Sequence, residues 1–309
     1  MVWSPSALTL KLREKETFLK ETEVMKGLNH PNLVKMLGVC IEKSPFFLVQ
    51  QLCSNGDLRK HLKLYEFVKT MSQSTSTSEK LDKVPKFPRL LGWCRDIIRG
   101  MSYLESHFLV HRDLAARNVL LDANLRAKVA DFGLTQADDL EADTEERAMA
   151  VLWSAPEAIE KKEFSHKSDV WSFGVTMWEV LSYADKPYRG LSKAKVKEKL
   201  KTSDYMMDTP TNYLRQSKRS WGAAYQVMAH CWARQPRARP TFPHLGVEVD
   251  RLMEGEREGR AARRLYRQAW AEARRGGRAG EREEGGRVSP EYDLSLATNT
   301  YEYDVIGDL

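Results

Sequence analysis

Apolar residues recur along the chain with two kinds of spacing. In residues 14–28 and 88–107 they return at mixed steps of three and four among polar positions, which predicts two amphipathic helices. Residues 33–39 and 46–50 are instead short apolar runs, joined by a polar turn at residues 42–45. This arrangement predicts two neighbouring strands that follow the first helix and precede the second.

Two further stretches differ in composition from the rest. Residues 69–85 are polar, rich in serine and threonine and without an apolar period, which indicates a mobile insert. Residues 251–288 are rich in Arg, Glu, Ala and Gly, and their first half is expected to extend a preceding helix into a linker. We therefore expect a folded domain over residues 14–253 and a tail over residues 254–309.

Composition narrows the class of protein. A chain of 309 residues with 42% hydrophobic content can hold one two-lobed domain plus a tail, or two small domains. The net charge of +6 is modest and unevenly spread, and in residues 251–288 basic and acidic residues are interspersed, so no nucleic-acid partner is expected. The four cysteines lie far apart, as in reduced cytoplasmic proteins. No apolar run reaches the ~18 residues of a membrane span, although a receptor origin stays open.

The stretch from His111 to Gly133 carries the most specific chemistry, because it reads HRDLAARNVLLDANLRAKVADFG. An HRD tripeptide followed by an asparagine, and then a DFG tripeptide, supply Asp113, Asn118 and Asp131. The last two offer oxygen ligands, which suit a hard cation such as magnesium bridging phosphates. Asp113 is then the candidate base that accepts a hydroxyl proton. Either tripeptide alone can arise by chance, but both in this order are specific.

These motifs resemble those of protein kinases, and the variant HRDLAARN resembles the tyrosine-kinase group. Serine/threonine kinases usually carry a lysine two residues after the catalytic aspartate, where this chain has Ala115. The resemblance implies ATP and magnesium as cofactors and a substrate phenol placed by Arg117. It also implies an α+β, two-lobed fold, with a small lobe truncated to two recognisable strands plus the αC helix and a mainly helical large lobe. Residues 1–13 form a leader without a match to the family.

The segment QQLCSNGDL, after the second predicted strand, resembles the hinge that joins the two lobes. The resemblance implies that the backbone carbonyl of Gln51 and the backbone N–H of Cys53 bind adenine. Leu120, in the apolar run after the catalytic loop, would form the floor beneath the base. A plain strand-to-helix turn, and a role for Leu120 in the core alone, are the alternatives.

Two parts of the family's small lobe have no match here. Neither a Gly-rich loop nor a VAIK strand precedes Glu21, which resembles the glutamate that pairs with a catalytic lysine. The nearest substitute is Lys11 in the alternating segment LTLKLRE, ten residues before Glu21. We treat Lys11 and Glu21 as candidate catalytic residues, with a solvated glutamate on a helix face as the alternative for Glu21. A small lobe without those parts is expected to bind nucleotide weakly and to expose a sheet edge.

The activation segment, which by resemblance runs from Asp131 to Glu157, also departs from the family. Residues 137–148 contain six carboxylates, one arginine and no tyrosine. Either this acidic run imitates a phosphate beside Arg112, or it is a solvated loop. Ala150 stands where tyrosine kinases usually have a proline that packs on the substrate ring. This difference motivates serine/threonine or dual specificity as an alternative.

The other anchors of the large lobe match the family. Asp169 in SDVWSFG resembles the buried aspartate that ties down the catalytic loop. Glu157 and Arg239 resemble the ion pair that locks the activation segment to the lobe. Both partners of that pair are present. This matters because a buried charge without its partner strongly lowers the stability of the folded protein.

The C-terminal segment brings three tyrosines into an acidic context: Tyr292, Tyr301 and Tyr303. The tail is therefore expected to be an autophosphorylation site that phosphotyrosine-binding domains recognise, with a disordered acidic end as the alternative. For the domain itself, we expect transfer of the ATP γ-phosphoryl group to protein tyrosine. A scaffold or pseudokinase with weak or no ATP binding is the alternative, because the roof of the nucleotide site is unmatched.

Overall fold

The chain forms two compact units, Met1–Gly259 and Arg260–Leu309. The computed structural model describes residues 19, 22–23, 25–42, 46–71, 84–131, 151–202 and 218–276. Several predictions fall outside these residues: those on Lys11, Glu21, Ala150, most of the insert, the acidic run of the activation segment and the three tail tyrosines.

The described residues of the small lobe include an antiparallel pair of strands, β1 (Met36–Cys40) and β2 (Phe47–Gln50). The register places Cys40 opposite Phe47, and a bulge interrupts the pairing between Met36 and Gly38. Both predicted strands are therefore confirmed, with the first shifted toward the turn. Within the part of the chain that the structure describes, the second edge of β2 has no strand beside it.

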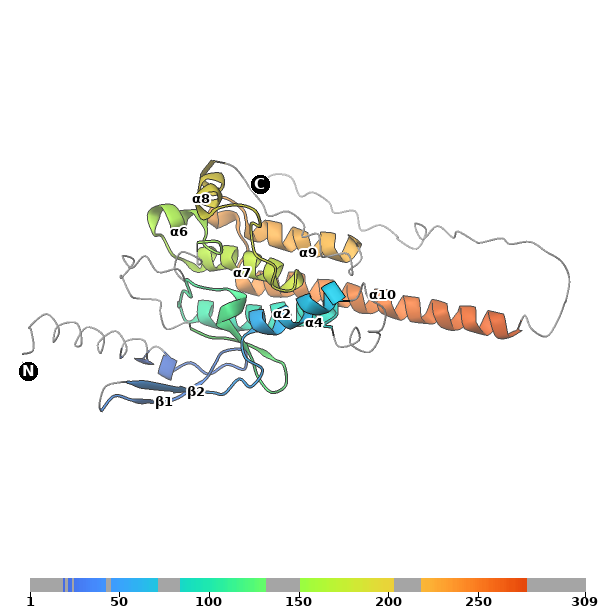
Figure 1. Cartoon of the computed structure of the whole chain (residues 1–309), viewed down its shortest axis with the longest axis horizontal. Coiled ribbons are helices and arrows are strands. Elements are labelled where there is room, and N and C mark those ends of the chain that lie inside the picture. The colour runs from blue at the N-terminus through green and yellow to red at the C-terminus, as the bar shows by residue number, and fades with distance from the viewer. Residues whose placement is uncertain are drawn as a thin grey trace, which may run out of the picture. The chain divides into compact units, whose positions relative to one another are not determined.

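The large lobe is mainly helical. Its helices and short 3-10 turns are α2 (Leu58–Met71), α4 (Phe87–Ser106), η1 (Ala116–Asn118), α6 (Pro156–Lys161), α7 (His166–Leu181), α8 (Lys193–Thr202), α9 (Lys218–Cys231), η4 (Pro236–Ala238) and the start of α10 (Phe242–Gly276). Figure 1 shows β1 and β2 on one side of α2 and α4, and α7 with α6, α8 and α9 on the other. The predicted α+β fold, with a few-stranded small lobe and a helical large lobe, is confirmed.

Two predicted helices have the expected position with adjusted ends. The apolar period of residues 88–107 corresponds to α4, which begins one residue earlier and buries ten side chains or glycines along one stripe. The expected helical extension beyond residue 251 is confirmed, because α10 continues to Gly276. The polar stretch starts later than residue 69, since residues 69–71 form the last turn of α2. None of the described helices is long and apolar enough to cross a membrane.

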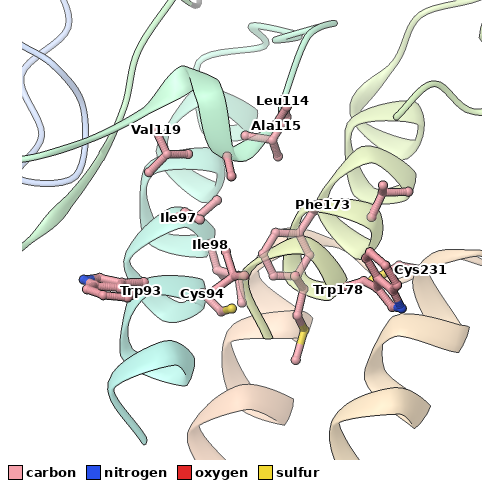
Figure 2. Close-up of a cluster of buried hydrophobic side chains, with 14 of the residues drawn as sticks. Trp93, Cys94, Ile97, Ile98, Leu114, Ala115, Val119, Phe173, Trp178 and Cys231 are labelled. Carbon is pink, nitrogen blue, oxygen red and sulfur yellow. The ribbon is translucent and has the colours of Figure 1, made fainter. Parts of the chain in front are cut away.

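Helix α7 is the centre of the large lobe. Ser165 caps its first turn, accepting from the N–H of Ser168 while the Ser168 hydroxyl accepts from the N–H of Ser165. Nearly every later position is buried, because α7 packs against both α4 and α9. In Figure 2, Ile98 of α4 and Phe173 of α7 point toward each other, near the loop that carries Leu114 and Ala115. The loop that carries Leu114 and Ala115 thus lies on a buried, closely packed support.

Helix α7 packs tightly against the end of α9 at Gly174. A methyl group added there would meet the ring nitrogen of Trp232 at 2.6 Å and Cβ of Cys231 at 2.7 Å. We expect Gly174→Ala to lower the free energy of unfolding by roughly 1–3 kcal/mol, because the packed helices must move apart. Urea unfolding measures this change. Gly222→Ala is the matched control, since nothing lies within 4 Å of the added methyl. It should stabilise α9 by up to about 1 kcal/mol, and an equal loss in both variants would contradict the packing argument.

Candidate active site

A buried carboxylate holds the HRD segment in place. The Asp169 carboxylate accepts from the backbone N–H of His111 at 2.7 Å and from that of Arg112 at 2.9 Å. Arg112 has a φ of 67°, in the left-handed region, where a non-glycine backbone is strained. Burial raises the pKa of Asp169 to about 7, and the two N–H donors act against this shift. The predicted anchor and its loop are therefore in direct contact.

The hydrogen bonds of His111 define its tautomer. Its Nε2 lies 3.0 Å from the carbonyl oxygen of Ala130 and must donate, while Nδ1 accepts from the backbone N–H of Asp113 at 3.3 Å. Burial lowers the pKa of His111, which agrees with a neutral ring. The imidazole thus connects Ala130, which precedes Asp131, to Asp113, the candidate base.

Asp113 is held between two side chains. One carboxylate oxygen forms a hydrogen-bonded ion pair with Arg117, and the other accepts from Nδ2 of Asn118 at 2.7 Å. The same Nδ2 donates to the backbone carbonyl of Asp113 at 2.7 Å. About a third of the Asp113 side chain, 34%, stays exposed. The carboxylate is thus fixed in orientation and still reachable by a substrate hydroxyl.

The guanidinium of Arg117 has a second contact besides Asp113. It lies over the ring of Trp153, 4.9 Å from the ring centre. A cation over an indole face is attracted by the ring quadrupole, most strongly where water is excluded. Arg117 is therefore positioned by a residue at the far end of the activation segment as well as by the catalytic loop.

The residues predicted to bind magnesium fit an oxygen-coordinated cation. Because Nδ2 of Asn118 faces two acceptors, its oxygen is the atom left for a ligand. Asp131 is exposed, with a φ of 55°, and the preceding Ala130 N–H donates to the carbonyl of Asn118 at 2.9 Å. Among the described residues, no group of three His, Cys, Asp or Glu side chains is arranged so that it could hold a metal ion by itself. A cation here would complete its shell with phosphate oxygens and water, as magnesium usually does.

Two backbone groups of the hinge have no hydrogen-bond partner among the residues that the structure describes. The N–H of Gln51 donates to the carbonyl of Lys35 at 2.8 Å. No described residue hydrogen-bonds to the carbonyl of Gln51 or to the N–H of Cys53, the two groups predicted to bind adenine. Leu120 lies in β3 (Val119–Leu121) and is half-buried, whereas both of its neighbours in the strand are buried. It forms an isolated β-bridge with Asp57, which follows the hinge. The predicted adenine contacts are thus in one connected region.

A buried ion pair joins α6 to Arg239, the residue that follows η4. The carboxylate of Glu157 accepts from two nitrogens of Arg239, at 2.5 and 2.9 Å. Arg239 also donates to the carbonyls of Lys167 and Ala233, and its guanidinium lies 5.0 Å from the ring centre of Trp171. The arginine side chain is fully buried. The two residues matched by resemblance form the expected ion pair, and the structure shows that it is bidentate.

Two charged residues of this site, Glu179 and Arg59, were not predicted from the sequence. Glu179 on α7 contacts both the catalytic loop and Trp153, and Arg59 on α2 lies beside it. The sequence does contain a signal for Glu179, because this acid lies near the end of the mainly apolar run VWSFGVTMWEVL. A charge in such a run is rarely buried without a partner.

Comparison with known proteins agrees with these motifs. The family described as protein tyrosine and serine/threonine kinase matches residues 8–249. The human tyrosine-protein kinase FRK is 34% identical over 242 residues, which are 77% of this chain and 43% of FRK. The mouse cytoplasmic tyrosine-protein kinase BMX is 36% identical over 244 residues, 78% of this chain and 34% of BMX.

A relative from the sponge Spongilla lacustris, the tyrosine-protein kinase SRK2, is 38% identical over 231 residues, 74% of this chain and 57% of SRK2. The matched part of this chain thus spans between about a third and three fifths of the length of these relatives. The family match begins at residue 8 and therefore includes Lys11.

Proposed function

Since the chain belongs to the protein tyrosine and serine/threonine kinase family, we propose that it transfers the γ-phosphoryl group of ATP to tyrosine residues of protein substrates. The observation that carries the choice of tyrosine is the position of Arg117. Its guanidinium pairs with Asp113 and lies on Trp153, beside the carboxylate that a substrate hydroxyl must reach. Ala115, where serine/threonine kinases usually have lysine, is fully buried and offers no charge.

The described residues have distinct roles in this reaction. Asp113 accepts the proton of the tyrosine hydroxyl as the phenol oxygen attacks the γ-phosphorus and the bond to the β-phosphate oxygen breaks to release ADP, and Arg117 orients the phenol. Asn118 and Asp131 hold magnesium, which neutralises charge on the phosphates when bound. The backbone of Gln51 and Cys53 receives adenine above Leu120. For Lys11 and Glu21, we propose the paired lysine and glutamate roles of the family.

The wider setting of the protein is also proposed. Protein substrates are expected from the family, and phosphorylated Tyr292, Tyr301 and Tyr303 would recruit phosphotyrosine-binding domains. We propose a cytoplasmic location, which the name of the BMX relative and the four free cysteines support. Reduced thiols are usual in that compartment.

One observation favours a scaffold as the second candidate. Phe47 and Val49, on one face of β2, keep 56% and 50% of their surface exposed, and no described strand pairs with the outer edge of β2. Apolar side chains beside an open edge suit pairing with another chain. Serine/threonine specificity, motivated by Ala150, is the remaining alternative and is separated from the first by the identity of the modified residue.

The test is phosphoryl transfer by the purified 309-residue chain. With ATP, magnesium and a tyrosine-containing peptide, we expect phosphotyrosine by phosphoamino-acid analysis, and none after EDTA removes the metal. A parallel peptide with serine in place of tyrosine should stay unmodified. If a folded sample forms no phosphoamino acid, the proposal is rejected in favour of a scaffold. Formation of phosphoserine would favour the serine/threonine alternative.

A further inference from the structure

Glu179 is a buried acid that the reaction above does not use. Only 1% of its surface is exposed, in the last turn of α7. One carboxylate oxygen, Oε2, accepts from the backbone N–H of Ala116 at 3.1 Å and from Nε1–H of the Trp153 indole at 3.1 Å. A single oxygen thus joins the catalytic loop to the end of the activation segment.

Both donors lead to the same side chain. Ala116 is the first residue of η1, the short turn that carries Arg117 and Asn118. Trp153 is the ring beneath the guanidinium of Arg117. Glu179 therefore fixes the backbone from which Arg117 extends and also the surface on which its charge rests. Arg117 in turn contacts Asp113.

A cation on another helix compensates the buried charge. Nε of Arg59 on α2 lies 3.7 Å from Oε1 of Glu179, and this nitrogen is buried without a hydrogen-bond partner among the described residues. Burial raises the pKa of Glu179 to about 7, while the Ala116 N–H and Arg59 act against the shift. The Glu179 carboxylate thus connects α7 to α2, to the catalytic loop and to the activation segment. Packing of α7 in the core does not by itself require these polar contacts.

We propose that Glu179 is a positioning residue for phosphoryl transfer, whose carboxylate holds Ala116 and Trp153 so that Arg117 and Asp113 keep their relative orientation. This inference rests on the proposed function. Glu179 does not touch the reacting groups, because its contacts reach Asp113 only through Ala116, Trp153 and Arg117, and it touches none of the residues assigned to adenine. Its loss should therefore affect the rate of transfer and leave nucleotide affinity unchanged.

Three variants of the full chain test this role through kinetics. Glu179→Ala removes both acceptor contacts and should lower kcat roughly 10- to 100-fold, with the Kd for ATP changed less than about threefold. Glu179→Gln retains one acceptor oxygen and should recover most of the lost rate. Val180→Ala, the fully buried neighbour on α7, is the control for damage to the helix and should leave kcat within about threefold per folded molecule.

A double-mutant cycle tests whether Trp153 transmits the effect. Trp153→Phe keeps an aromatic ring under Arg117 but removes the indole N–H that Glu179 accepts. If the two residues act together, Trp153→Phe added to Glu179→Ala should lower kcat by less than the product of the single effects. Independent effects that multiply, or a parallel fall in ATP affinity, would overturn the proposal.

Hydrogen exchange gives a readout that does not need activity. Glu179→Ala should reduce protection of the amides of residues 114–118 and 151–155, whereas Val180→Ala should not. If the unmodified chain transfers no phosphate, the proposed function fails, and this exchange pattern still decides whether Glu179 holds the two segments. Unchanged exchange in both segments would reject the positioning role even in an active chain.

Discussion

Replacing Asp113 with asparagine should lower kcat for tyrosine phosphorylation by roughly 10²- to 10⁴-fold, the range for loss of a positioned general base. Asparagine is nearly the same size, so the loop should keep its fold. Its amide, however, accepts through one oxygen only, whereas the carboxylate accepts from Arg117 with one oxygen and from Asn118 with the other. The variant loses the base, and its new amide N–H also faces an N–H donor of either Arg117 or Asn118.

Steady-state kinetics with separate titration of ATP and peptide measures this effect. The Kd for ATP should change little, because the predicted adenine contacts belong to Gln51 and Cys53 of the hinge. Asp250→Asn makes the same chemical change at a surface ion pair with Arg95 and should leave kcat within about twofold. Retention of more than a tenth of kcat by the Asp113 variant would argue against its role as base.

Replacing Arg239 with alanine should lower the free energy of unfolding by about 3–5 kcal/mol. The guanidinium is fully buried, and its removal leaves the carboxylate of Glu157 without its cation. The carbonyls of Lys167 and Ala233 also lose their donor. For a domain of this size the melting temperature should fall by roughly 6–20 °C.

Thermal and urea unfolding of two further variants make this prediction specific. Arg237→Ala, at an exposed position in η4, should change stability by no more than about 0.5 kcal/mol. The double variant Glu157→Met with Arg239→Met should be less destabilised than the sum of the single changes, since it leaves no unpaired buried charge. Equal losses for Arg237→Ala and Arg239→Ala would show that the ion pair has no special role.

Local patterns were sufficient for the elements whose period or motif is continuous in sequence. The three- and four-residue steps of residues 88–107 predicted α4 to within one residue at each end, because one buried stripe determines that helix. The apolar runs around residue 45 predicted β1 and β2. The HRD and DFG motifs predicted Asp113, Asn118 and Asp131 as candidate site residues, because such motifs are continuous in sequence.

Contacts between distant parts of the chain were decided by the tertiary structure. Ala116 and Glu179 are 63 positions apart, and Trp153 and Glu179 are 26 apart, so no local period relates them. Whether a glutamate in an apolar helix is buried with donors, or turned toward water, depends on which elements surround that helix. The sequence alone therefore determined the catalytic motifs and the main secondary structure. Only folding brought the loop, activation segment, α2 and α7 around one carboxylate, because burial and its compensation are properties of packed neighbours.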